Sequence, residues 1–159
     1  MTDYVIKQSR IDSMPGLSKT HFLNKNAQRK NKSLGDLTGI TGFGFHLIEV
    51  PPGKESTEFH VHYYEDECTY VLSGTGLVKI GEAEHEIAAG DFIGYRKNGE
   101  AHTMTNTGRG PLTCIVVGER LAHDVGDYPN LKKRIFRNFG RTANVVELEN
   151  IQEPDLGAK

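Results

Sequence analysis

Two histidines and a glutamate in the middle of the chain have the types and spacing of a metal-binding site. His60 and His62 are separated by one residue, and Glu67 follows five positions later. Successive side chains of a strand alternate between its faces, so the two histidines project to the same side. A turn through 63–66 would bring Glu67 back on the neighbouring strand, close to that pair. Two neutral imidazoles and a carboxylate form an open, facial ligand set for a divalent metal, and His102 is a fourth candidate.

The elements that must position these side chains are short strands. Apolar residues recur through 43–48, and a Pro-Pro-Gly sequence at 51–53 ends that run as a turn would. Strands of about four to eight residues, each bounded by glycine or proline turns, predict an all-β sandwich or barrel over residues 41–118. We expect no amphipathic helix in this core. The further strands are expected at 67–72, 77–80, 85–87, 92–95, 102–107 and 112–118.

The segments on either side carry weaker patterns. Residues 1–40 show little periodicity and are read as a mostly irregular N-terminal extension that wraps the domain or crosses to a second subunit. Basic residues are spread through 18–32, but no RNA-binding motif or DNA-binding helix pair accompanies them, so we expect no nucleic-acid partner. Residues 119–159 are expected to pack on the barrel as a C-terminal segment, with a turn at 127–130 and a short strand at 144–148.

Length and composition predict one soluble globular domain. The chain has 159 residues and a formal net charge of −2, which gives no reason to expect a polyanionic partner. No apolar run is long enough to span a membrane, and the N-terminus lacks the form of a signal peptide. The two cysteines, Cys68 and Cys114, form no Cys-x-x-Cys pair. The expectation is a cytoplasmic, reduced protein without a membrane partner.

The spacing of these residues resembles the two-motif signature of the cupin superfamily, in its single-domain, cupin type 2-like form. One extra residue stands before the first histidine, Lys97 stands where the second motif usually has proline, and one residue is inserted before it. These departures affect the shape of loops more than the metal ligands. The positions that match the first motif are Gly53, His60, His62, Glu67 and Gly74, and those that match the second are Gly90, Gly99, His102 and Asn106.

The resemblance implies a fold, a ligand set and a group of metals. Cupins fold as a double-stranded β-helix, a jelly-roll-type barrel with the metal inside. By this analogy the four ligands are His60, His62, Glu67 and His102. Three nitrogens and one oxygen leave two open positions on an octahedral ion, which suits iron, manganese, nickel or cobalt, and zinc fits if fewer ligands bind.

Strand parity sketches the pocket around these ligands. The same faces as Glu67 and His102 should carry Thr69, Val71, Met104 and Asn106, while Cys68 should point to the opposite face as a packed thiol. Candidates to orient a substrate or carry a proton are Tyr95, Lys79 and Glu49, each with the alternative of an ordinary strand residue. Tyr63 and Tyr64 are expected at the rim. His46 and His85 match no motif position and are read as ordinary strand residues.

Three classes of function fit this pattern. The first is a small metal-dependent enzyme that isomerises or epimerises a sugar or sugar phosphate, for which Lys79, Arg96 and Lys97 offer a basic cluster. The second is an iron-dependent dioxygenase, which needs a more apolar pocket. The third is a non-catalytic cupin that binds a small molecule. Since small cupins cover exposed sheet faces and edge strands by pairing, we also expect a homodimer.

Overall fold

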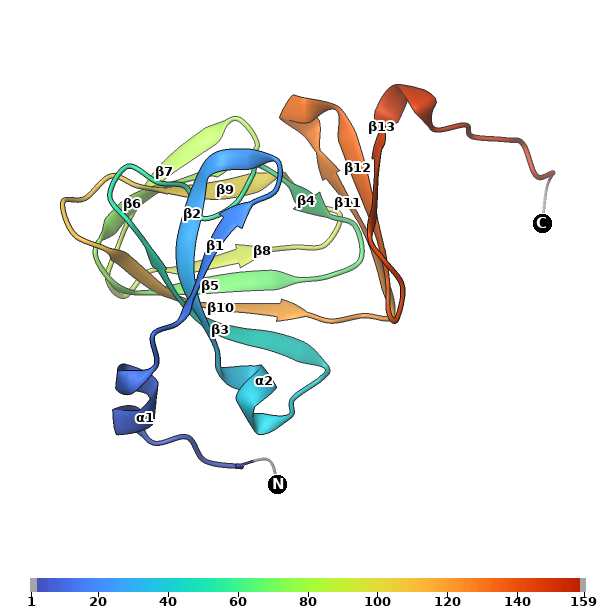
Figure 1. Cartoon of the computed structure of the whole chain (residues 1–159). Coiled ribbons are helices and arrows are strands. Elements are labelled where there is room, and N and C mark those ends of the chain that lie inside the picture. Colours follow the sequence, from blue (N-terminus) through green and yellow to red (C-terminus); the bar gives the residue numbers. More distant parts are fainter. Residues whose placement is uncertain (1–2, 158–159) are drawn as a thin grey trace.

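The protein is built almost entirely from β-sheet (Figure 1). The computed structural model describes residues 3–157, so the first two residues of the N-terminal extension and the last two of the C-terminal segment lie outside it. The strands are β1 (Leu17–His21), β2 (Asn24–Ser33), β3 (Phe43–Val50), β4 (Val61–His62), β5 (Glu67–Ser73), β6 (Thr75–Ile80), β7 (Ala83–Ala88), β8 (Phe92–Tyr95), β9 (His102–Asn106), β10 (Leu112–Glu119), β11 (His123–Tyr128), β12 (Lys133–Asn138) and β13 (Asn144–Glu147). The helical elements are short: α1 (Gln8–Ser13), α2 (Leu34–Thr38), η1 (Pro129–Leu131) and η2 (Leu148–Asn150).

Three sheets make up the molecule. The largest has the strand order β1-β2-β3-β10-β5-β8, the second has the order β7-β6-β9, and the third has the order β13-β12-β11-β4. The first two sheets form the two sides of a jelly-roll-type barrel, and β11, β12 and β13 stand together at one side of it (Figure 1). All seven strands expected from residue 43 to residue 118 are present as β3 and β5 to β10, so the prediction of an all-β fold is confirmed.

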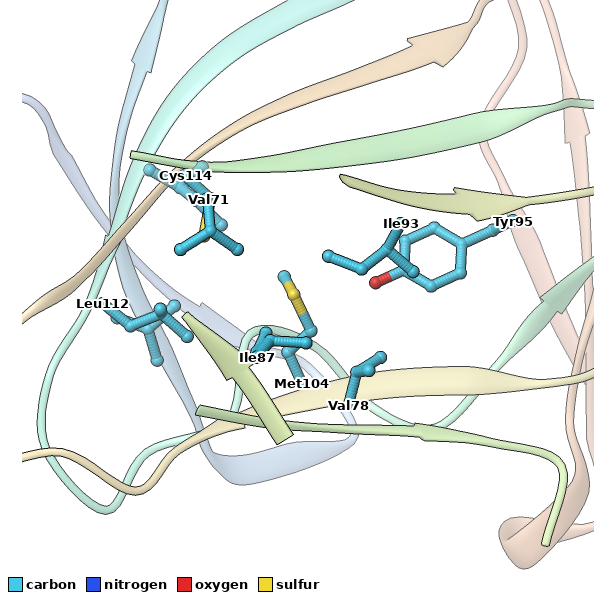
Figure 2. Close-up of a cluster of buried hydrophobic side chains, with 10 residues drawn as sticks. Val71, Val78, Ile87, Ile93, Tyr95, Met104, Leu112 and Cys114 are labelled. Carbon is cyan, nitrogen blue, oxygen red and sulfur yellow. The ribbon is translucent and has the colours of Figure 1, made fainter. Parts of the chain in front are cut away.

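The core lies between the two barrel sheets (Figure 2). It follows the expected alternation, because Thr69 and Val71 of β5 are fully buried whereas Tyr70 and Leu72 are each 43% exposed. Side chains from both barrel sheets contribute to this core, which therefore holds the two sheets together around the site. The main buried cluster consists of Ile48, Val50, Val71, Val78, Ile87, Ile93, Tyr95, Met104, Leu112 and Cys114.

The N-terminal segment differs from the expectation of a mostly irregular extension. Strands β1 and β2 form a hairpin, and β2 pairs antiparallel with β3 of the same chain. On β2 the buried residues Ala27 and Asn31 alternate with the exposed Lys30, so the strand has a period of two. Only Ala27 on the buried face is apolar, and a hydrophobic pattern therefore could not reveal it. The tertiary pairing with β3 determines this strand.

The C-terminal segment contributes two strands that its sequence pattern did not indicate, β11 and β12. Strand β11 pairs with β12 on one side and with the two-residue strand β4 on the other, where Gly126 faces His62 in register. Thus β11, β12 and β13 supply most of the sheet that carries His62. Within residues 3–157 no helix is long and apolar enough to cross a membrane.

Candidate metal centre

The four expected metal ligands line the same cavity inside the barrel. His60 Nε2 lies 3.1 Å from His62 Nε2, and the ring centroids of His60 and His102 are 4.6 Å apart. Glu67 Oε1 lies 3.7 Å from His102 Nε2. We call this group of His60, His62, Glu67 and His102 the tetrad. The chain thus brings together side chains that are up to 42 positions apart in sequence.

Glu67 reaches the tetrad by a different route from the one expected. It opens β5, whose hydrogen-bonded neighbours are β10 and β8, so it does not lie on a strand paired with the histidines. The turn at 63–66 instead carries the chain from one sheet to another, and Glu67 faces the histidines across the barrel. His60 is fixed from the other side by a β-bridge in which His60 and His102 exchange backbone hydrogen bonds of 3.2 and 2.8 Å.

Hydrogen bonds to the far nitrogens define the tautomers of the histidine pair. Nδ1 of His60 lies 2.8 Å from the Glu58 carbonyl oxygen, and Nδ1 of His62 lies 2.7 Å from Asp124 Oδ2. Both oxygens are acceptors, so in each neutral ring Nδ1 carries the hydrogen and Nε2 carries a lone pair. Two lone pairs therefore face each other at 3.1 Å, an arrangement that repels unless a cation is shared between them.

His60 itself carries no second proton at neutral pH. Burial, together with the neighbouring His102 and His62, lowers the pKa of His60 to about 3. Burial alone would raise the pKa of Glu67, but the surrounding histidines outweigh it and hold the value at about 2. His60 therefore offers a neutral imidazole and Glu67 an ionised carboxylate, the protonation states that a metal requires. Adjacent ligands about 2.1 Å from one ion at right angles would be ~3 Å apart, in agreement with the observed nitrogen separation.

His102 provides a second indication that a ligand belongs in the tetrad. The side chain is 4% exposed, and within residues 3–157 neither ring nitrogen has a hydrogen-bond partner. Buried polar groups are nearly always paired, so such a ring indicates a partner that is not part of the chain. The imidazole is held in place by Tyr95, whose ring stacks on it at a centroid distance of 3.7 Å and an angle of 6°. The donor set thus fits a divalent metal.

Behind His62 lies a group of charged side chains that sequence reasoning missed. Asp124 of β11 is 2% exposed, accepts from His62 and receives a 2.8 Å hydrogen bond from Arg137. Arg137 also donates to Glu65, so its guanidinium holds both carboxylates. His62, Glu65 and Asp124 lie close enough together to bind an ion themselves, but the positive charge of Arg137 already satisfies the two acids. We interpret this group as the support that orients His62.

The tetrad opens into a cavity of about 330 Å³. Three residues were considered for substrate orientation or proton transfer, and one of them, Tyr95, lines this cavity. Its hydroxyl, however, points into the apolar core (Figure 2). Burial there raises the pKa of the Tyr95 hydroxyl. Lys79 and Glu49 instead point to the outer faces of β6 and β3, where Lys79 covers the Phe59 ring and Glu49 lies opposite Lys30. Of the other expected pocket residues, Met104 lines the cavity, whereas Thr69, Val71 and Asn106 are buried but do not line it.

Several expectations about the pocket wall need correction. The sequence predicts an ordinary strand residue at His46, but His46 lines the cavity because it shares the inward face of β3 with Ile48. Arg96 and Lys97 are exposed and do not line it. Tyr63 and Tyr64 border a separate depression instead. Lining residues that the sequence did not reveal come from the two flanking segments: His21, Phe22, Arg29, Gly126, Tyr128, Ile135 and Arg137.

Comparison with known proteins agrees with this geometry. Residues 46–118 match the family model described as the cupin domain. The crystal structure of a proposed sugar phosphate isomerase from Acidithiobacillus ferrooxidans is 46% identical, with 95% of this chain and 96% of that chain covered at a TM-score of 0.91. The chain belongs to the cupin superfamily. It is thus a cupin type 2-like protein, and the similarity to its relative extends over both flanking segments.

Two further relatives are more distant. A cupin sugar phosphate isomerase from Silicibacter pomeroyi is 23% identical at a TM-score of 0.80, covering 91% of this chain and 95% of that one, which shows the shared fold. An uncharacterized protein from Methanocaldococcus jannaschii is 35% identical over 66 residues, which are 42% of this chain. The matched region spans about half the length of that curated relative.

Proposed function

We propose that this cupin is a metal-dependent enzyme that isomerises or epimerises a small polar molecule of the sugar or sugar phosphate class. His60, His62, Glu67 and His102 would hold the metal. The observation that carries the proposal is the approach of the Nε2 atoms of His60 and His62 to 3.1 Å, while the far nitrogen of each ring is bonded to an acceptor oxygen. The reaction class is supported by the 46% identical relative, which is described as a proposed sugar phosphate isomerase.

The protein's own residues would position the metal and its substrate. A divalent ion held by the tetrad would act as a Lewis acid on oxygen atoms of a bound substrate. Asp124 keeps the Nδ1 hydrogen on His62, and Tyr95 holds the plane of His102. The cavity of about 330 Å³ lies at the lower end of the range for small-molecule sites, so the substrate must be small. Iron, manganese, nickel, cobalt and zinc all remain consistent with three nitrogens and one carboxylate.

Metal analysis tests the site. We expect near-stoichiometric transition metal by mass spectrometry in protein purified without an affinity tag, and loss of that metal in His62→Ala. His85→Ala is the matched control, because His85 lies exposed on β7, away from the tetrad. Equal metal content in all three proteins would contradict the proposed ligands. Absence of metal from the wild type, even after reconstitution, would remove the enzymatic proposal.

Turnover tests the reaction class. The metal-loaded protein is incubated with a panel of aldose and ketose phosphates in D₂O, and NMR follows both product formation and deuterium uptake next to the carbonyl. We expect uptake that depends on the metal and is lost in His62→Ala. Bound iron with metal-dependent oxygen consumption would instead support the dioxygenase alternative. Saturable binding without any conversion would support the non-catalytic alternative.

A further inference from the structure

We infer that Arg29 forms an anion-binding subsite in the pocket, where its guanidinium holds the phosphate or carboxylate group of a small molecule whose other oxygens reach the tetrad. The inference rests on the proposed function for the role of the tetrad. It adds the class of substrate, an anionic one, and the residue that recognises the charge. The basic cluster expected from sequence cannot serve this purpose, because Arg96 and Lys97 are exposed and Lys79 points away from the cavity.

Arg29 is placed in the pocket by the N-terminal hairpin. On β2 it shares the inward face with Ala27 and Asn31, whereas Lys30 faces solvent. Its Nη1 donates a 2.8 Å hydrogen bond to the carbonyl oxygen of Ser56. This bond fixes the guanidinium against the cavity wall, and a guanidinium has five N–H donors in a rigid fork suited to phosphate and carboxylate. Most of these donors are thus left for a ligand.

The charge of Arg29 is not paired within the part of the chain that the structure describes. Within residues 3–157 no carboxylate lies within ion-pair distance of its guanidinium, whereas Arg137 holds Glu65 and Asp124. Burying an unpaired charge is unfavourable, so a partly buried one in a cavity indicates a missing anion. Burial lowers the pKa of Arg29, and the charge of Glu67 offsets part of this effect from a distance. That carboxylate belongs to the tetrad and is not available as a partner.

The surroundings of Arg29 suit the remainder of such a ligand. His21, the last residue of β1, lines the cavity and accepts a hydrogen bond on Nδ1 from the Leu23 backbone, so in the neutral ring Nε2 carries the hydrogen. His21 stacks on Phe22 at 4.6 Å, and both rings meet Tyr128 edge-on. The cavity therefore presents a guanidinium and an imidazole N–H beside an aromatic wall that can pack against carbon atoms.

Three matched probes separate the charge from the rest of the ligand. Glycerol 3-phosphate, 3,4-dihydroxybutanoate and glycerol share an adjacent pair of hydroxyl groups and differ in carrying a phosphate, a carboxylate or no charge. Binding of each to the manganese-reconstituted protein is measured by isothermal titration calorimetry and by ligand NMR relaxation. We expect the wild type to bind at least one anionic probe about tenfold or more tightly than glycerol, as charge-assisted hydrogen bonds predict. The anionic probe that binds more tightly shows whether the subsite prefers a phosphate or a carboxylate group.

Substitutions assign the effect to Arg29. We expect Arg29→Gln, which keeps a donor for the Ser56 carbonyl, to lose the preference for the anion, and Arg29→Lys to retain part of it. Arg96→Met makes an equal change of charge at an exposed position and should bind like the wild type. Circular dichroism and metal content confirm that each variant is folded and loaded. If Arg29→Gln fails to fold, Arg29→Lys still decides, since it should bind the favoured anion more weakly than the wild type.

Two results would overturn the inference. One is a wild type that binds glycerol and both anionic probes equally, and the other is an Arg29→Gln variant that keeps the full preference for the anion. Both readouts are independent of turnover. Anion binding that depends on Arg29 without isomerase activity would reject the proposed reaction and retain the subsite. Isomerase activity with anion binding that does not depend on Arg29 would retain the reaction and reject the subsite.

Discussion

Asp124 offers the sharpest test of how the tetrad is held. Its carboxylate is buried and bonds to His62 and Arg137. Burial would raise its pKa, but these two partners lower it from 3.8 to about 2. That difference corresponds to about 2 to 3 kcal/mol of folding free energy at neutral pH. Because the pKa is lower in the folded state, this stability is present above about pH 4 and is lost as the pH falls towards 2.

We predict that Asp124→Asn loses about 2 kcal/mol of stability at pH 7 and binds metal about 10- to 100-fold more weakly. The uncharged amide holds the Nδ1 hydrogen of His62 less firmly, and one of its own N–H groups must face Arg137. Urea unfolding of the metal-free protein gives the stability, and competition with a chelator gives the affinity. The difference in stability from the wild type should shrink as the pH is lowered towards 2.

Asp127→Asn is the matched control. Asp127 lies on the same strand and is also paired with an arginine, Arg134, but it does not contact the tetrad. Its variant should lose stability and keep its metal affinity. Equal affinity loss in both variants would indicate general loosening of β11, and unchanged metal affinity in Asp124→Asn would refute the orienting role.

Three further predictions address other features. Tyr95→Phe should leave stability and metal affinity nearly unchanged, because the hydroxyl has no partner within residues 3–157. Tyr95→Leu should weaken metal binding, because it removes the ring stacked on His102. Equal metal affinities of the two variants would contradict this prediction. Gly74→Ala should lose more than about 1 kcal/mol in urea unfolding, because φ is +90° and the new Cβ would lie 2.6 Å from the Pro111 carbonyl oxygen; Gly90→Ala, with φ +97° and open space, should lose less. Light scattering after size exclusion should show a homodimer, since Tyr70, Leu72 and Phe92 are exposed apolar side chains on the outer face of β5 and β8, and a monomer at micromolar concentration would contradict it.

The barrel and the shared face of His60 and His62 could be predicted because their signals are local. His60 and His62 share one strand face, and glycine and proline turns delimit β5 to β10. The same rules placed Thr69 and Met104 inside the barrel. Short-range alternation and turn chemistry suffice for such features, since each depends on residues a few positions apart.

Arg29 and Asp124 could not be found in this way. Strand β2 is polar on both faces and exists because β3 offers it hydrogen bonds, and β11 lies between strands that begin 61 and 133 residues into the chain. A charged residue in a polar stretch resembles a solvated one until its tertiary neighbours are known. The support for the tetrad was therefore hidden in segments that looked peripheral.

The pairing of β4 with β11 also makes the tetrad a reporter of folding far along the chain. Strand β4 is only two residues long, and its partner belongs to the sheet completed by β12 and β13. Any ion held by His62 would bind only molecules in which that sheet is formed, so thermodynamic linkage makes metal a stabiliser of the C-terminal strands. Amide hydrogens of β11 and β12 should then exchange with solvent more slowly in metal-loaded than in metal-free protein, because the metal stabilises strands that unfold together.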